Sequence, residues 1–121
     1  MFGRDPIIVL GGPCIDSDAK EQHKFLTNVF PGVDALVPNE GEIGFSNILQ
    51  KVLGNRETVF KDPIDGMIFM DGNHLVRGHP IGLSMDLSTM GSPYLSGLLE
   101  NFMNSDYQPL IQTSRFCPYT C

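Results

Sequence analysis

The residues with the clearest capacity for chemistry stand at the end of the sequence. Cys117 and Cys121 are separated by three residues, and they follow an apolar run, Leu110 and Ile111, that predicts a short strand. A folded domain rarely ends on a reactive thiol directly after a strand, so we expect the sequence to stop in the middle of a site. A zinc site would need four ligands, and no second Cys/His pair at ligand spacing is visible. A small disulfide between the two thiols, or no role for either, stays open.

Residues 112–121, which read Gln-Thr-Ser-Arg-Phe-Cys-Pro-Tyr-Thr-Cys, resemble the opening of a radical S-adenosylmethionine (radical SAM) domain. That family reads Thr-Ser-Arg-Gly-Cys-Pro-Tyr-x-Cys and has a third cysteine after two further residues. The resemblance implies that Cys117 and Cys121 are two of three thiolate ligands of a [4Fe–4S] cluster, whose fourth iron is left to S-adenosylmethionine. Phe116 stands where the family has a glycine, so either the turn, which suits a positive φ, is rearranged here or the site is degraded.

The resemblance also implies the chemistry of the intact protein. An electron from the cluster cleaves S-adenosylmethionine reductively, and the resulting 5′-deoxyadenosyl radical abstracts hydrogen from a small-molecule or peptide substrate. A reductant such as flavodoxin or ferredoxin would be a partner. Two thiolates cannot hold a cubane cluster, so we expect these 121 residues alone to be inactive. The alternative function is a non-catalytic α/β binding module in which both cysteines are incidental.

Upstream elements must hold such a site, and the first half of the sequence predicts strands and helices in alternation. Residues 6–10 and 33–37 are short apolar runs typical of buried parallel strands. Capping residues and an apolar stripe predict a helix over residues 18–30 between them, which gives a βαβ unit with a right-handed crossover. A second helix is predicted over residues 43–53. Its apolar residues, all expected to face the core, are Phe45, Ile48, Leu49, Val52 and Leu53.

Three motifs in this half resemble the end of the cobalamin-binding-type domain that precedes the radical SAM domain in many family members. They lie at residues 8–13, which end in Gly-Gly-Pro, at residues 30–34, which end in Val-Asp, and at residues 40–42, Glu-Gly-Glu. Asn39 stands where the family has a further glycine. The resemblance implies that residues 1–55 are the C-terminal part of a Rossmann-like parallel sheet. Because two strands are too few for such a sheet, we expect its other strands before Met1.

Gly11 and Gly12 are the candidate ligand-binding residues of this domain. Two glycines at the carboxyl end of a parallel strand let a ligand approach bare backbone, and in the resembling family this step borders the nucleotide tail of cobalamin. A tight turn is the competing interpretation, so cobalamin binding stays open. His79 copies half of the family's cobalt-ligating motif, Asp-x-His-x-x-Gly, but Arg77 stands at the acid position and no carboxylate is adjacent, so we interpret this match as coincidence.

Three other reactive residues have simpler interpretations. Glu40 and Glu42 could form an acid–base pair, but they stand at the predicted start of a helix, where its dipole favours acidic side chains. Cys14 is expected to be a small buried or half-buried thiol. None of the three is predicted to be catalytic.

The second half of the sequence predicts a connection and the beginning of another domain. Residues 56–108 read as a linker with a β-hairpin over 67–77, around an Asp-Gly turn, and a short helix over 93–102. Residues 109–121 would supply the first strand of a partial (β/α) radical SAM barrel. The predicted fold class is therefore α/β, comprising the end of a cobalamin-binding-type sheet, a linker and the truncated start of a barrel.

Composition limits the partners. The net charge is −6, and the eight Lys and Arg residues are scattered, which argues against a nucleic-acid partner. No apolar run approaches the length of a bilayer span, and no signal peptide is visible, so we expect a soluble, cytoplasmic protein without a membrane partner. Three cysteines, an odd number, do not suggest a secreted disulfide framework.

Overall fold

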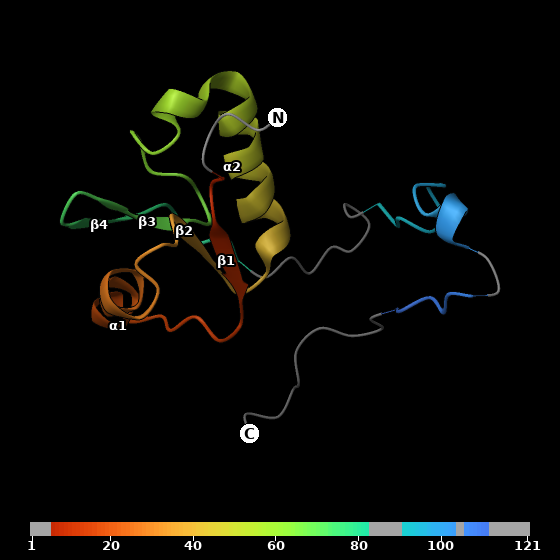
Figure 1. Ribbon diagram of the computed structural model, residues 1–121, viewed down its shortest axis with the longest axis horizontal. Helices are drawn as coiled ribbons and strands as arrows, with labels where there is room; N and C mark the ends of the chain where they lie inside the picture. The colour runs from red at the N-terminus through yellow and green to blue at the C-terminus, as the bar shows by residue number, and fades with distance from the viewer. Residues whose placement is uncertain (1–5, 83–90, 104–105, 112–121) are drawn as a thin grey trace. The chain divides into compact units, whose positions relative to one another are not determined.

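A computed structural model of the chain describes residues 6–82, 91–103 and 106–111 (Figure 1). The chain divides into two compact units, Met1–Leu83 and Ser84–Cys121. The first unit contains a sheet and its helices, and the second has only short turns among its described residues. Cys117 and Cys121, together with the rest of residues 112–121, lie outside the described residues.

The first unit is built on a four-stranded mixed sheet with the order β1-β2-β3-β4. Strand β1 (Val9–Gly12) runs parallel to β2 (Ala35–Pro38), and the connection between them contains a helix, as a parallel pair requires. Strand β3 (Ile68–Asp71) is antiparallel to β2, and β4 (His74–Arg77) is antiparallel to β3. The α/β class and the parallel pair are confirmed.

Strand β1 begins later than the strand predicted at residues 6–10. Its register pairs Val9 with Ala35 and Gly12 with Pro38, so both glycines of the Gly-Gly motif belong to the strand. The apolar run marks which residues can be buried, but the hydrogen-bonding partner decides where the ladder starts and ends.

The two helices largely follow their predicted ranges. Helix α1 (Ala19–Lys24) begins after Asp18, whose carboxylate accepts hydrogen bonds from the backbone N–H groups of Lys20 and Glu21. It continues into a π-helical turn, η1 (Phe25–Val29), and the helix has ended at Phe30, before Pro31. Helix α2 (Gly41–Asn55) is longer than predicted and is followed by the 3₁₀ turn η2 (Arg56–Thr58).

The sheet is covered on both faces, with α1 on one side and α2 on the other (Figure 1). Alternation along β2 divides the core, because successive side chains of a strand point to opposite faces. Leu36 packs with Leu26 and Ile68 on the α1 side. The buried residues on the α2 side are Ala35, Val37, Ile48, Val59, Ile64, Met67 and Phe69.

The prediction for α2 is correct for part of its apolar face only. Ile48 is buried and Val52 is half-buried against the sheet. Phe45, Leu49 and Leu53 are exposed, so the prediction that they face the core is wrong. Helical spacing identifies an apolar surface, but it does not say how much of that surface the rest of the fold covers.

The predicted hairpin is present, and it continues the sheet instead of forming a separate structure in the linker. Asp71 pairs with His74 across a two-residue turn, in which Gly72 adopts a φ of +57°. Strand β3 places Phe69 opposite Ala35 of β2, and Phe69 is fully buried. The hairpin therefore supplies part of the core that holds α2.

The described residues of the second unit contain turns and one 3₁₀ turn, η4 (Glu100–Phe102), where a helix was predicted over residues 93–102. Gly97 has a φ of +78°, which is incompatible with a right-handed helix. Leu95, in the middle of this range, is 92% exposed and does not contribute to a core. The helix prediction is wrong.

A strand was also expected at Leu110 and Ile111, and none is present in the described residues 106–111. Both side chains are exposed. The backbone of Leu110 bonds instead to the hydroxyl of Tyr94, which accepts from the Leu110 N–H at 3.1 Å and donates to the Leu110 carbonyl at 3.0 Å. A β-strand needs a neighbouring strand with which it forms backbone hydrogen bonds, and the two bonds to the Tyr94 hydroxyl do not supply one.

Candidate functional site

The carboxyl ends of β1 and β2 lie together, because the two strands are parallel and in register to their last residues. Beyond them, the backbone N–H of Asn39 donates to the Gly12 carbonyl at 3.3 Å, and the N–H of Ile15 donates to the same carbonyl at 3.4 Å. The two loops that leave the sheet are thus joined at Gly12. This edge is where open α/β sheets bind ligands.

Gly11 and Gly12 have different reasons to be glycine. A Cβ on Gly11 would lie 3.3 Å from the Val37 carbonyl oxygen, so Gly11 permits the close approach of β1 and β2. Gly12 has a φ of +128°, a conformation that side chains rarely adopt, and a Cβ there would meet nothing within 4 Å. The turn interpretation therefore accounts for both glycines. Gly12 additionally leaves open space beside its backbone, which a ligand could approach.

Asn39 adopts a φ of +59°, and it is the only described residue other than glycine with a positive φ. After glycine, asparagine is among the residues that best tolerate this left-handed conformation. The resembling family has a glycine at this position, and the backbone conformation explains why either residue fits. Sequence reasoning identified the substitution but not its conformational reason.

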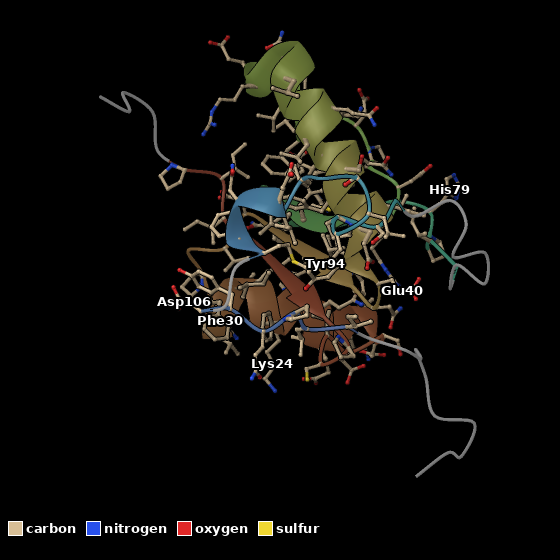
Figure 2. The ribbon with its side chains drawn as sticks, turned by 90° about the vertical axis from the view of Figure 1, so that its right-hand side faces the viewer. Lys24, Phe30, Glu40, His79, Tyr94 and Asp106 are labelled. Carbon is tan, nitrogen blue, oxygen red and sulfur yellow. The ribbon has the colours of Figure 1, made fainter. Side chains whose placement is uncertain are left out.

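Glu40 and Glu42 stand at the start of α2, where Figure 2 labels Glu40. Glu40 is the N-cap residue and Glu42 lies in the first turn, as the interpretation based on the helix dipole predicted. Gly41 between them would place a Cβ at an ordinary 3.8 Å from Val37.

Cys14 is exposed, so the prediction of a buried or half-buried thiol is wrong. The chain turns at Gly12, and the neighbouring Ile15 packs against the α1-side core instead. In the ranges that the structure describes, no three His, Cys, Asp or Glu side chains gather in a way that could hold a metal ion. Cys14 is therefore a lone thiol near the strand ends.

His79 is exposed after β4 (Figure 2), and a carboxylate does lie beside it, from a distant part of the sequence. The Asp65 carboxylate accepts from the backbone N–H of His79 at 3.2 Å, and the His79 carbonyl accepts from the Gly66 N–H at 2.8 Å. These bonds hold the main chain and not the imidazole. Asp65 therefore connects the loop before β3 to the segment after β4, so this contact has a structural role.

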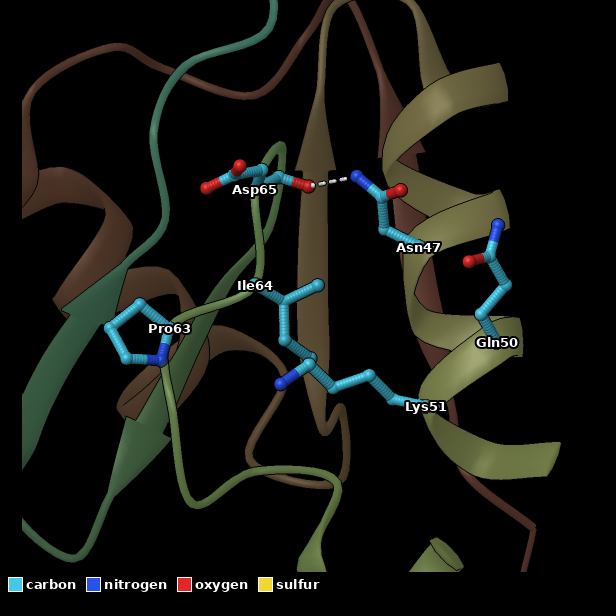
Figure 3. Close-up of a pocket in the computed structure, with 6 residues that line it drawn as sticks. All are labelled: Asn47, Gln50, Lys51, Pro63, Ile64 and Asp65. Atoms are coloured by element: carbon cyan, nitrogen blue, oxygen red, sulfur yellow. Dashed lines mark hydrogen bonds between the residues drawn. The ribbon is translucent and has the colours of Figure 1, made fainter. Parts of the chain in front are cut away.

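A surface hollow of about 390 Å³ lies between α2 and the loop before β3 (Figure 3). It was not expected from the sequence. The Asn47 side chain on α2 connects the two sides of the hollow, because its amide donates a hydrogen bond to the Asp65 backbone carbonyl at 3.0 Å. The lining residues are Asn47, Gln50, Lys51, Pro63, Ile64 and Asp65. One ammonium group, two amides and the single carboxylate of Asp65 on an open surface do not form a nucleophile–base pair or a metal site, so this hollow is a weaker candidate than the strand ends.

Comparison with known proteins gives no assignment, since no family model, no curated protein and no solved structure matches the chain. Among the described helices, none combines the length and the apolar character needed to cross a membrane. The functional candidates therefore depend on the sequence motifs and on the geometry at the ends of β1 and β2.

Proposed function

We propose that this chain is part of a radical SAM enzyme and spans the end of a cobalamin-binding-type domain and the start of the radical SAM domain. The observation that carries the proposal is the sequence of residues 112–121, with Cys117 and Cys121 at the spacing of two cluster ligands. The order of the motifs supports it, because the Gly-Gly and Glu-Gly-Glu motifs precede the cysteines in the order that the family has.

The geometry of the first unit gives further support. Gly12 and Asn39 meet at the carboxyl ends of two parallel strands, and both adopt the positive φ that family glycines would allow. The edge of such a sheet is a common place for a ligand with a flat or extended part. The open space beside Gly12 fits the approach of such a ligand. We include cobalamin in the proposal as the ligand that would approach the backbone at Gly12.

In the proposed enzyme, a [4Fe–4S] cluster would supply the electron for reductive cleavage of S-adenosylmethionine, which provides the radical for hydrogen abstraction. Cys117 and Cys121 would hold two of its irons as thiolates. The substrate class is a small molecule or a peptide, and the electron comes from an external reductant such as flavodoxin or ferredoxin.

The decisive experiment is anaerobic reconstitution with iron and sulfide of a longer gene product that includes the residues after Cys121. We expect broad visible absorbance and bound iron, and we expect Cys117→Ala and Cys121→Ala each to abolish both. Cys14→Ala is the matched control and should retain the cluster. A longer product that stays colourless and free of iron would contradict the proposal, and the chain would then be better described as a non-catalytic α/β binding module.

A further inference from the structure

A contact within the described part of the second unit joins the Tyr94 side chain to the main chain of Leu110. The Tyr94 hydroxyl accepts a hydrogen bond from the Leu110 N–H at 3.1 Å and donates one to the Leu110 carbonyl at 3.0 Å. Both distances are those of ordinary hydrogen bonds. We call this pair of bonds the Tyr94 clasp. It closes a loop between two residues that are 16 positions apart in the sequence.

A hydrogen-bonded turn holds Tyr94 at its end of the clasp. The Ser92 hydroxyl accepts from the Leu95 N–H at 3.3 Å, and the Ser92 carbonyl accepts from the Ser96 N–H at 3.0 Å. Pro93 lies within this turn and restricts its backbone, because the proline ring fixes φ at about −65°. The half-buried Tyr94 side chain therefore projects from backbone that its own neighbours hold in place.

A second contact lies inside the loop that the clasp closes. The rings of Phe102 and Tyr107 meet edge to face, with centroids 6.2 Å apart and planes at 80° to each other. Both residues lie between Tyr94 and Leu110 in the sequence, so the two contacts are nested as they are in a hairpin. The two limbs of the loop thus meet at two places, which supports a defined arrangement of the clasp.

The clasp acts on the main chain of Leu110 and not on its side chain. The side chains of Leu110 and Ile111 are both exposed, so neither is packed into a core. Packing therefore does not fix the position of Leu110, whereas the two bonds from Tyr94 do. A tyrosine hydroxyl is suited to this role because it can accept and donate at once, and phenylalanine can do neither.

Leu110 stands seven residues before Cys117, the first cysteine of the proposed cluster site. We propose that Tyr94 is a positioning residue for this site, because its hydroxyl fixes the main chain from which the sequence continues to Cys117 and Cys121. This role rests on the proposed radical SAM function and adds to it a residue outside the cysteine motif. Groups that hold the ligands of a metal site in place, without touching the metal, determine how firmly the site retains it.

The clasp itself is tested on the 121-residue chain, without iron or S-adenosylmethionine. Amide hydrogen exchange at Leu110, measured by NMR, should become about 10-fold faster in Tyr94→Phe, because this variant keeps the ring and loses both bonds. Tyr107→Phe is the matched control. It keeps the ring that contacts Phe102 and should leave exchange at Leu110 unchanged, while circular dichroism verifies that both variants fold. Equal exchange at Leu110 in the wild type and in Tyr94→Phe overturns the proposal.

The positioning role is tested on the longer polypeptide after anaerobic reconstitution with iron and sulfide. Tyr94→Phe should release iron to a chelator about 10-fold faster than the wild type and Tyr107→Phe do. It should also reduce the change that S-adenosylmethionine produces in the electron paramagnetic resonance spectrum of the reduced cluster. Failure of Tyr94→Phe alone to take up iron would support the proposal equally. A contact of purely local importance would alter exchange at Leu110 and leave both cluster measurements unchanged, and that result overturns the proposal.

The positioning role and the radical SAM function fail in different ways. A wild-type longer polypeptide that binds no iron contradicts the function and removes the positioning role with it, and exchange at Leu110 still shows whether the clasp forms. A wild type that holds a cluster, beside a Tyr94→Phe variant that holds it equally well, contradicts the role of Tyr94 alone.

Discussion

The Asp34 carboxylate accepts a hydrogen bond from the backbone N–H of Ile8, with 2.7 Å between Oδ2 and the nitrogen. The Asp34 N–H donates in return to the Ile8 carbonyl at 2.9 Å. This reciprocal pair joins the chain before β1 to the chain before β2, one residue ahead of the first ladder pair, Val9 and Ala35. The Val-Asp motif, noticed in the sequence for its resemblance, thus has a structural function in setting the register of the parallel strands.

We predict that Asp34→Ala lowers the free energy of unfolding by about 1 kcal/mol, because it leaves the Ile8 N–H without its acceptor at an exposed position where water partly replaces it. Asp34→Asn keeps an acceptor oxygen, so it should lower the free energy of unfolding by a smaller amount. Urea unfolding measures both. Asp62→Ala, at an exposed position outside the described helices and strands, is the control and should change stability by less than about 0.5 kcal/mol. Equal losses for Asp34→Ala and Asp62→Ala would contradict the role of Asp34.

Two glycines in α2 should respond to alanine with opposite signs. At Gly54 a Cβ would meet nothing within 4 Å, so Gly54→Ala should stabilise the chain by up to about 1 kcal/mol through helix propensity. At Gly44 a Cβ would lie 2.9 Å from the Gly66 carbonyl oxygen and 2.9 Å from Val37. The helix must then move off the sheet, so Gly44→Ala should destabilise by roughly 1 to 2 kcal/mol despite the same propensity gain. Thermal unfolding of both variants, side by side, decides the matter, and stabilisation by Gly44→Ala would show that α2 packs more loosely.

The sequence predicted the α/β class, the parallel pair, the hairpin and both helices of the first unit, because each depends on local signals such as apolar periodicity, Asp18 as a cap and Gly72 in a turn. It could not predict that β3 pairs with β2, since nothing local in Phe69 or Ala35 encodes that contact. The exposure of Phe45, Leu49 and Leu53 on α2 was missed for a related reason, because the periodicity of an apolar stripe does not show whether the chain itself covers that stripe.

The candidate site was predicted in part. The sequence identified Gly11 and Gly12. The structure shows that their roles differ, because Gly11 lies close to the Val37 carbonyl and Gly12 has a positive φ. The proximity of Gly12 to Asn39 follows from the register of the parallel strands, which no motif in the sequence specifies. The contact of Asp65 with the His79 main chain joins residues that are distant in sequence, so no motif could indicate it. The interpretation of Cys117 and Cys121 stays a prediction, because both lie outside the described residues.

Asn39 offers a direct test of the backbone conformation at the strand ends. We predict that Asn39→Gly leaves stability unchanged within about 0.5 kcal/mol, and that Asn39→Ala lowers it by about 1 kcal/mol, because alanine tolerates a φ of +59° poorly. Gly12→Ala should cost more, on the order of 1 to 3 kcal/mol, since φ +128° lies farther from any region open to alanine. Denaturant unfolding gives the free energy of unfolding of each of the three variants and so their order of stability. If Asn39→Ala proves as stable as Asn39→Gly, the left-handed conformation is not required there.

The final prediction separates the strand ends from the hollow as the place of corrinoid contact. In a longer polypeptide titrated with hydroxocobalamin, we expect binding to slow amide hydrogen exchange at Gly12, Cys14 and Ile15, where the backbone at Gly12 is open, and to leave Ile64 and Asp65 of the hollow unchanged. Because the Asp65 carboxylate holds the His79 main chain and not its ring, His79→Ala should not alter the visible spectrum of the bound corrinoid. Protection confined to Ile64 and Asp65 would move the site to the hollow, and a spectral change in His79→Ala would make that imidazole a cobalt ligand after all. Absence of binding would remove cobalamin from the proposal and leave the cluster chemistry of Cys117 and Cys121 to be judged on its own reconstitution.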